Sequence, residues 1–126
     1  MIYMHNFGFQ SLDIYQLAKT LVIHSYRLTK AFPDTEKFAL VQQINRAVIS
    51  IPSNIAEGYS RSSNKDKAHF LNIAYGSLME IVCQYEIAAS LGYITDKEYE
   101  EILGKAHDLA VRISNFRTYL GSQKRV

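Results

Sequence analysis

The sequence predicts an all-α fold, an antiparallel up-down-up-down four-helix bundle. Apolar residues recur at the three- and four-residue spacing of a helix face through almost the whole chain. Only short turns separate these periodic segments, and short connections place neighbouring helices antiparallel. With 126 residues, 48% of them hydrophobic, the chain can bury a core of its own. We therefore expect a single bundle domain over residues 1–126, with a short N-terminal extension at 1–10 and a basic tail at 121–126.

Two prolines shape the first two expected helices. The first helix spans about residues 11–31 and stops at 32–33, because the residue before a proline resists the helical region. The second spans about 35–59 and contains Pro52, which lacks a backbone donor and crowds the preceding turn. The second helix is therefore expected to be kinked near Pro52 or briefly broken, and to end at Gly58.

The third and fourth helices carry clearer end signals. The third spans about residues 65–91, with Ser63 in position to cap its start and Gly92 to close it in a left-handed conformation. The small residues at 76–77 are expected to let a neighbouring helix approach closely. The fourth spans about 95–121, and its opening Thr-Asp-Lys-Glu string fits a capping box.

Several kinds of site are excluded by what the chain lacks. The single cysteine, Cys83, rules out an intramolecular disulfide framework and a cysteine zinc site. A di-iron centre in a helix bundle needs two acid-x-x-His motifs, and only residues 66–69 have that spacing. The sequence holds no glycine-rich phosphate loop and no Gly-x-Ser-x-Gly string. We therefore expect no enzyme: no catalytic residues, no metal and no cofactor.

The sequence shows no targeting signal, since no charged leader followed by an apolar stretch opens the chain. Its uninterrupted apolar runs are only a few residues long, so no membrane association is expected. Without a disulfide pair, a reducing cytoplasm is the expected location.

A polar stripe follows the second expected helix, opposite its apolar stripe. On a helical wheel its members fall within about 80° of one another. Three interpretations are open: an ordinary solvent face, a contact between subunits and a ligand groove. Solvent faces favour Lys and Glu, whereas short amides and hydroxyls suit a packed, hydrogen-bonded contact. The expected interface residues are Gln43, Arg46, Ser50, Asn54 and Glu57.

The chain contains nine tyrosines and six phenylalanines, more than a core of this size can absorb. Exposed aromatic patches commonly mark an interface, so we expect a homo-oligomer, with residues 2–9 packed across the bundle end or against a neighbour. Tyrosine beside arginine can alternatively stack on nucleobases. The aromatic residues off the best core stripes are Tyr3, Phe7, Phe9, Tyr15, Tyr59 and Tyr75.

Basic residues gather locally although the net charge is only +2. They concentrate in residues 61–67 and in the C-terminal helix and tail, where the alternative is a solvated face. Two hypotheses follow. The first is a non-enzymatic oligomeric protein that binds nucleic acid, RNA or DNA, and the second is an assembly or adaptor protein that binds none. The candidate nucleic-acid contacts are Arg46, Asn54, Arg61, Lys65, Lys67, Arg117, Lys124 and Arg125.

Several short strings fall in the order and spacing of a known family. They are Phe-Pro at 32–33, Leu-Val-Gln-Gln-Ile-Asn-Arg-Ala at 40–47, Ser-Ile-Pro-Ser-Asn-Ile-Ala-Glu-Gly at 50–58, Ala-Tyr-Gly-Ser at 74–77 and Leu-Gly-Tyr at 91–93. Over about residues 7–120 the chain resembles the four-helix bundle proteins related to the 23S ribosomal RNA intervening-sequence proteins of bacteria. The resemblance implies the bundle fold and a role in RNA binding. Distantly similar proteins, the accessory variability proteins of diversity-generating retroelements, imply a ring-shaped pentamer that binds nucleic acid and a reverse transcriptase.

Overall fold

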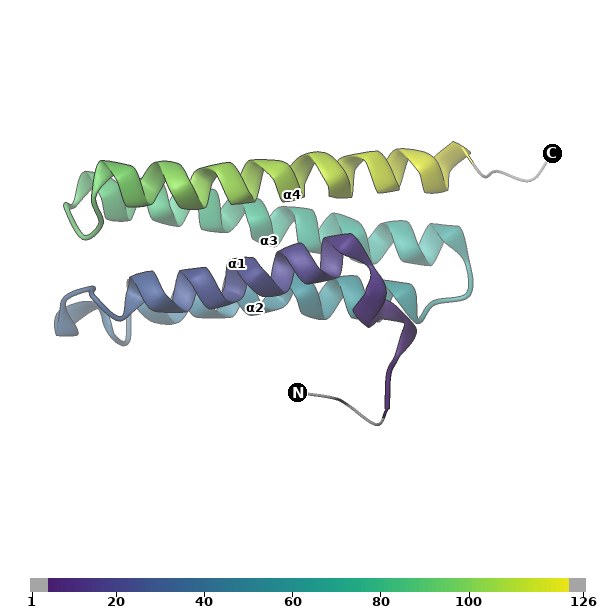
Figure 1. Cartoon of the computed structure of the whole chain (residues 1–126), viewed down its shortest axis with the longest axis horizontal. Helices are drawn as coiled ribbons and strands as arrows, with labels where there is room; N and C mark the ends of the chain where they lie inside the picture. Colours follow the sequence, from purple (N-terminus) through teal and green to yellow (C-terminus); the bar gives the residue numbers. More distant parts are fainter. Residues whose placement is uncertain (1–4, 123–126) are drawn as a thin grey trace.

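The computed structural model describes residues 5–122, which fold into four long helices packed side by side (Figure 1). The prediction of an all-α four-helix bundle is confirmed, and residues 5–122 contain no strand. Figure 1 shows successive helices running in opposite directions along one long axis. The elements are the short 3₁₀ turns η1 (Gly8–Ser11) and η2 (Asp34–Glu36) and the helices α1 (Asp13–Thr29), α2 (Leu40–Tyr59), α3 (Asn64–Ser90) and α4 (Asp96–Ser122).

A continuous apolar core runs along the bundle axis and receives side chains from all four helices. These side chains repeat at helical spacing, so each helix presents one apolar face inward. Burying one such Leu or Ile side chain stabilises the fold by roughly 1.5–3 kcal/mol. The residues buried most completely include Ala18 and Leu21 of α1, Ile44, Val48, Ile51 and Ile55 of α2, Leu78 and Ile81 of α3, and Ile102, Leu109 and Ile113 of α4.

The starts of α3 and α4 lie within one residue of the predicted positions, because side chains cap both helices. At α3 the Ser63 hydroxyl accepts the backbone N–H of Asp66 at 3.1 Å. At α4 the Thr95 hydroxyl accepts the N–H of Glu98 at 3.0 Å, and the Glu98 carboxylate accepts the N–H of Thr95 at 2.9 Å. These reciprocal bonds satisfy backbone donors that the first helical turn leaves free.

The start of α2 lies further along the chain than the sequence predicted. Residues 34–36 form η2 and α2 begins at Leu40, with the Glu36 carboxylate accepting the Leu40 N–H at 3.3 Å. The same carboxylate accepts the Tyr93 hydroxyl at 2.7 Å. Because this bond ties the α1–α2 connection to the α3–α4 connection, the chain around Glu36 is held outside the helix.

The structure tests the predictions made for Pro52 and for three glycines. Helix α2 continues unbroken through Pro52, while the kink stays a prediction. Gly58 is buried inside α2, and a Cβ added there would lie 3.1 Å from the Cβ of Phe70, so Gly58 allows close approach of α3 instead of ending α2. Gly92 does adopt the predicted left-handed conformation, with φ of 78°. The expectation that a neighbouring helix approaches closely at Gly76 is wrong, since a Cβ added there would meet no atom within 4 Å.

Candidate functional site

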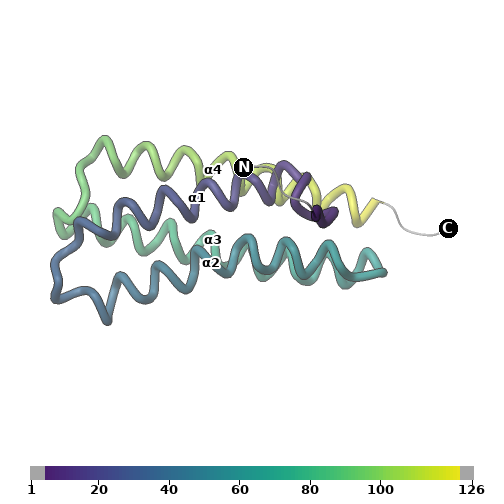
Figure 2. Tube along the Cα trace, turned by 60° about the horizontal axis from the view of Figure 1, so that its bottom comes forward, coloured from purple at the N-terminus to yellow at the C-terminus, as the bar shows by residue number. Residues whose placement is uncertain are grey.

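Four of the predicted nucleic-acid contacts come together at one end of the bundle. Arg61 lies in the α2–α3 turn, Lys65 and Lys67 lie in the first turns of α3, and Arg117 lies near the end of α4. Figure 2 shows the α2–α3 turn at the same end of the molecule as the last turns of α4. We call this region, formed by residues 5–15, 51–79 and 109–122, the basic–aromatic end.

Aromatic rings hold three of these cations in place. The guanidinium carbon of Arg61 lies 4.6 Å from the centre of the Phe70 ring, and that of Arg117 lies 4.2 Å from the Tyr75 ring. The ammonium of Lys67 lies 5.4 Å from the Tyr59 ring and donates a hydrogen bond to the Tyr59 carbonyl at 2.9 Å. Contacts of this kind at partly exposed sites are worth about 0.5–1 kcal/mol each, so they orient the cations without neutralising them.

Arg61 and Arg117 keep most of their hydrogen-bond donors free. Arg61 forms an ion pair with Glu57 at 3.5 Å, in which both side chains are about half exposed. Arg117 donates one hydrogen bond to the Asn72 amide oxygen at 2.9 Å. Because an exposed ion pair contributes little and a guanidinium has five donors, both arginines retain donors for a further anion.

The distribution of charge distinguishes the two halves of the bundle. The basic–aromatic end carries five basic and three acidic residues, whereas the opposite half, residues 16–50 and 80–108, carries seven basic and nine acidic residues. Helix dipoles do not alter this contrast, since antiparallel neighbours place N- and C-terminal helix ends together at each end of the bundle. The side-chain charges therefore set the sign of the potential, and the small net charge of the chain conceals the asymmetry.

Two members of the predicted polar stripe have found partners inside the chain. The Ser77 hydroxyl of α3 donates to the Ser50 hydroxyl at 2.9 Å. The Asn54 amide donates to the carbonyl and the hydroxyl of Ser50, at 2.8 and 2.9 Å. Of the small residues at 76–77, which were expected to let a neighbouring helix approach, Ser77 is the one that contacts α2. Ser50 therefore forms part of the α2–α3 contact, while the Asn54 amide is bonded within α2.

The stripe borders a trough of about 380 Å³ between α2 and α3. Gln84 lines this polar trough and is only 9% exposed, and its amide oxygen has no hydrogen-bond partner. Arg46 and Glu80 also line it, and neither forms an ion pair or side-chain hydrogen bond within residues 5–122. The lining residues are Gln43, Arg46, Ala47, Ser50, Ser77, Glu80 and Gln84.

Neither Gln84 nor Glu80 was among the site residues predicted from the sequence. The spacing held a signal for Gln84, which stands three residues after the buried Ile81 and four before the buried Ala88. A glutamine on an inward face is a buried amide, and buried amides need partners.

The remaining candidate residues do not join one surface. Arg46 lies about 20 Å from Tyr59, the last residue of α2, since the helical rise is 1.5 Å per residue, and Arg61 lies beyond that end. Glu57, one of the expected interface residues, pairs with Arg61 at the basic–aromatic end. Lys124 and Arg125, like Tyr3, lie outside the described residues. Within residues 5–122 no three His, Cys, Asp or Glu side chains are grouped as metal ligands, and no helix could span a membrane.

Comparison with known proteins identifies the family. The family model described as 23S rRNA-intervening sequence protein matches residues 10–116. The chain belongs to this family. The match includes the polar trough and most of the basic–aromatic end, but it stops one residue before Arg117. It confirms the resemblance to this family seen in the sequence.

One solved structure supports the fold. It is a protein of unknown function from the S23 ribosomal protein family of Bacteroides thetaiotaomicron, with a TM-score of 0.77 and 24% identity, over 82% of this chain and 97% of that one. At this identity the likeness concerns the fold alone. No curated protein matches the chain.

Proposed function

We propose that this protein is a non-enzymatic bundle protein that binds structured RNA through its basic–aromatic end. The observation that carries the proposal is the gathering of Arg61, Lys65, Lys67 and Arg117 at one end, three of them stacked on aromatic rings. Basic groups meet phosphates and aromatic faces meet bases, which is the chemistry of nucleic-acid surfaces. The family's description, which refers to 23S rRNA, favours RNA over DNA.

The salt dependence of binding follows from the number of phosphate contacts. Four such contacts would give a slope of about −3 to −4 in a plot of log affinity against log salt concentration. Raising salt from about 50 to 200 mM would then weaken binding by roughly 100-fold. Binding that does not change with salt would contradict a phosphate-dominated interface.

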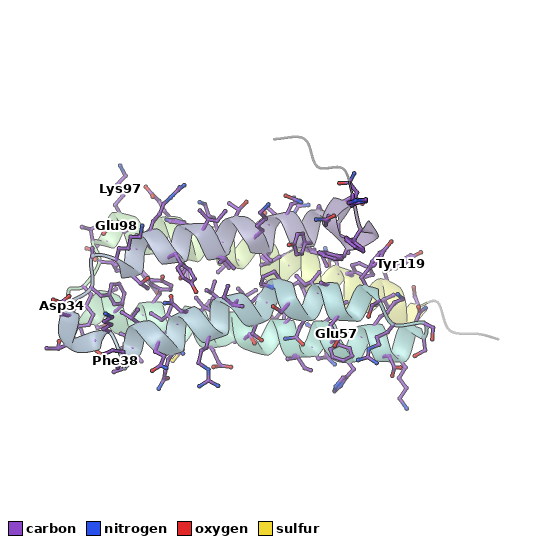
Figure 3. The ribbon with its side chains drawn as sticks, turned by 90° about the horizontal axis from the view of Figure 1, so that it is seen from below. Asp34, Phe38, Glu57, Lys97, Glu98 and Tyr119 are labelled. Atoms are coloured by element: carbon purple, nitrogen blue, oxygen red, sulfur yellow. The ribbon has the colours of Figure 1, made fainter. Side chains whose placement is uncertain are left out.

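A pair of matched lysines tests the location of the interface. Lys65 and Lys97 are both exposed and both occupy the second position of a long helix, α3 and α4 respectively. Lys97 lies at the end of the molecule away from Tyr119 (Figure 3). By fluorescence anisotropy with a labelled RNA hairpin, Lys65→Glu is expected to weaken binding at least tenfold and Lys97→Glu less than twofold. Equal losses, or no binding by the native protein, would contradict the proposal.

A second function, assembly into a homo-oligomer, is favoured by the polar trough. Gln84 lines the trough beside Arg46 and Glu80, and its buried amide oxygen has no hydrogen-bond partner. An unsatisfied buried oxygen costs about 1–3 kcal/mol, and a donor from a second copy would recover it. The alternative occupant is a protein partner of another kind, in the adaptor function.

The charge distribution also supports a ring. Residues 16–50 on α1 and α2 carry five basic and two acidic residues, whereas residues 80–108 on α3 and α4 carry two basic and seven acidic residues. A head-to-tail contact between these faces joins opposite charges, and such contacts form a ring when the rotation between neighbouring subunits closes. The subunit number that the resemblance implies is five.

Sedimentation velocity tests the assembly proposal. Arg46→Glu is expected to dissociate the oligomer, because it reverses the charge beside Glu80. Gln84→Leu is expected to weaken assembly while leaving the subunit as stable as before or more stable, since it removes an unsatisfied buried amide. A native protein that sediments as a monomer, or an Arg46→Glu variant that stays fully assembled, would contradict this function.

A further inference from the structure

An apolar cavity opens at the basic–aromatic end, where all four helices contribute side chains. Its volume is about 200 Å³. Ile14, Ile55 and Leu71 form a buried floor, while Tyr59 and Tyr119 are 46% and 57% exposed at the mouth. Figure 3 shows Tyr119 at this end of the molecule. We call this space the terminal cavity; its other lining residues are Leu12, Gly58, Asn64, Lys67, Phe116 and Leu120.

We propose that the terminal cavity receives one unpaired nucleobase, so that the preferred target is an RNA with a bulged or flipped-out nucleotide. This inference rests on the proposed RNA-binding function and deepens it. Sequence-specific RNA recognition commonly targets unpaired bases that can stack on aromatic side chains. The occupant is thus a part of the same ligand whose phosphates meet the surrounding basic residues.

The size of the cavity selects a single ring system. An engineered apolar cavity of about 150 Å³ holds benzene, and pockets for complete small-molecule ligands begin at about 300 Å³. A cavity of about 200 Å³ therefore has room for a base but not for a whole nucleotide. The sugar and phosphate of that nucleotide would stay at the mouth.

The mouth offers the groups that a nucleotide needs. Lys67 lines the cavity, with its ammonium 2.9 Å from the Tyr59 carbonyl and 5.4 Å from the Tyr59 ring. A phosphate outside the mouth would meet this cation, and the Arg61 guanidinium is held nearby on Phe70. Asn64, a polar side chain of the lining, can bond a base edge. A purely apolar occupant would use neither the cation nor the amide.

The wall formed by Tyr59 is held by the N-terminal segment. A Cβ added at Gly8 would lie 2.5 Å from the Tyr59 hydroxyl oxygen, so the phenol packs directly on the η1 backbone. This contact restricts the ring before any ligand arrives. A preformed stacking surface loses less conformational freedom on binding than a mobile one.

The test compares two RNA hairpins that differ only in one bulged 2-aminopurine. The native protein is expected to bind the bulged hairpin about tenfold more tightly than the fully paired one, and to change the fluorescence of the 2-aminopurine. Tyr119→Ala should abolish this preference while binding to the paired hairpin persists. Tyr26→Ala, at an exposed tyrosine of the opposite half, is the matched control and should keep the preference.

The outcomes separate this inference from the function on which it rests. Equal binding of both hairpins, with no fluorescence change, would overturn the base-binding cavity and leave RNA binding intact. A preference that survives Tyr119→Ala would also overturn it, because the base would then lie elsewhere. If the native protein binds neither hairpin, the proposed RNA-binding function itself fails.

Discussion

Aromatic residues gather at both ends of the bundle, but they are used differently. In the half that contains the α1–α2 and α3–α4 connections, Tyr85 is buried and its hydroxyl lies 2.6 Å from the Ser25 hydroxyl. Phe32 packs against both Tyr85 and Tyr93, with ring centres 6.4 and 5.4 Å apart. At the basic–aromatic end the rings are partly exposed and carry cations. One set stabilises the fold, and the other remains available for a ligand.

Hydrogen bonding explains the difference. A buried phenol needs a partner, and Tyr85 both pairs with the Ser25 hydroxyl and donates to the Ser25 carbonyl at 3.1 Å. An exposed ring needs none, so it can stack on arginine or lysine instead. The same residue type therefore indicates structure or binding according to its burial, which composition alone does not reveal.

The largest expected effect contrasts two tyrosines. Tyr85→Ala removes a fully buried ring and should lower the free energy of unfolding by about 3–5 kcal/mol. Tyr119→Ala removes an exposed ring and should change it by less than about 0.5 kcal/mol. Urea denaturation monitored by circular dichroism measures both. Similar losses would show that the two ends do not differ as described.

The buried Tyr85 is also expected to make the stability of the fold depend on pH in the alkaline range. Burial raises the pKa of Tyr85 to about 12, with the Ser25 hydrogen bond acting in the opposite direction. Between pH 10 and 12 the tyrosine loses its proton in the unfolded chain and keeps it in the folded protein. The free energy of unfolding therefore falls as pH rises through that window. The expected loss is about 2–3 kcal/mol, measured by denaturation at each pH. In Tyr85→Phe this part of the slope should vanish, and an unchanged slope would contradict the assignment.

Two glycines sharpen the comparison at the level of packing. Gly58→Ala should destabilise the fold by about 1 kcal/mol, because the added Cβ crowds Phe70 where α2 and α3 meet. Gly76→Ala should stabilise it by up to about 1 kcal/mol, since that helical position is open. Thermal melting of the two variants measures the difference. Shifts of the same sign would show that the close approach at Gly58 is unimportant.

The smallest effect on stability is expected at Arg61. Its ion pair with Glu57 is exposed, so Arg61→Gln should change the free energy of unfolding by less than about 0.5 kcal/mol. The slope of log RNA affinity against log salt should nevertheless fall by about 0.9, the value for one phosphate contact. Arg27→Gln, in the opposite half, is the control. Loss of stability without a change in slope would make Arg61 a structural residue.

Local signals explain which parts of the fold were predictable. The helix starts at Ser63 and Thr95 depend on hydrogen bonds that span three residues, so the sequence contains all the groups that form them. At the start of α2 the Glu36 carboxylate accepts the N–H of Leu40, four residues on, and also the hydroxyl of Tyr93, 57 residues away. A contact of that separation leaves no local pattern. The sequence therefore predicted an earlier start for α2.

The candidate site also has a part that the sequence predicted and a part that depends on the packing of the helices. Residue types and helical spacing determined that Arg61, Lys65 and Lys67 lie near one turn and that a polar stripe follows the second helix. Only the packing of α4 against α3 brought Arg117 to that turn, and only the α2–α3 contact buried Gln84 without a partner for its oxygen. Periodicity fixes which face of a helix is apolar, because burial drives it. The neighbour that each remaining side chain meets is decided when the helices pack.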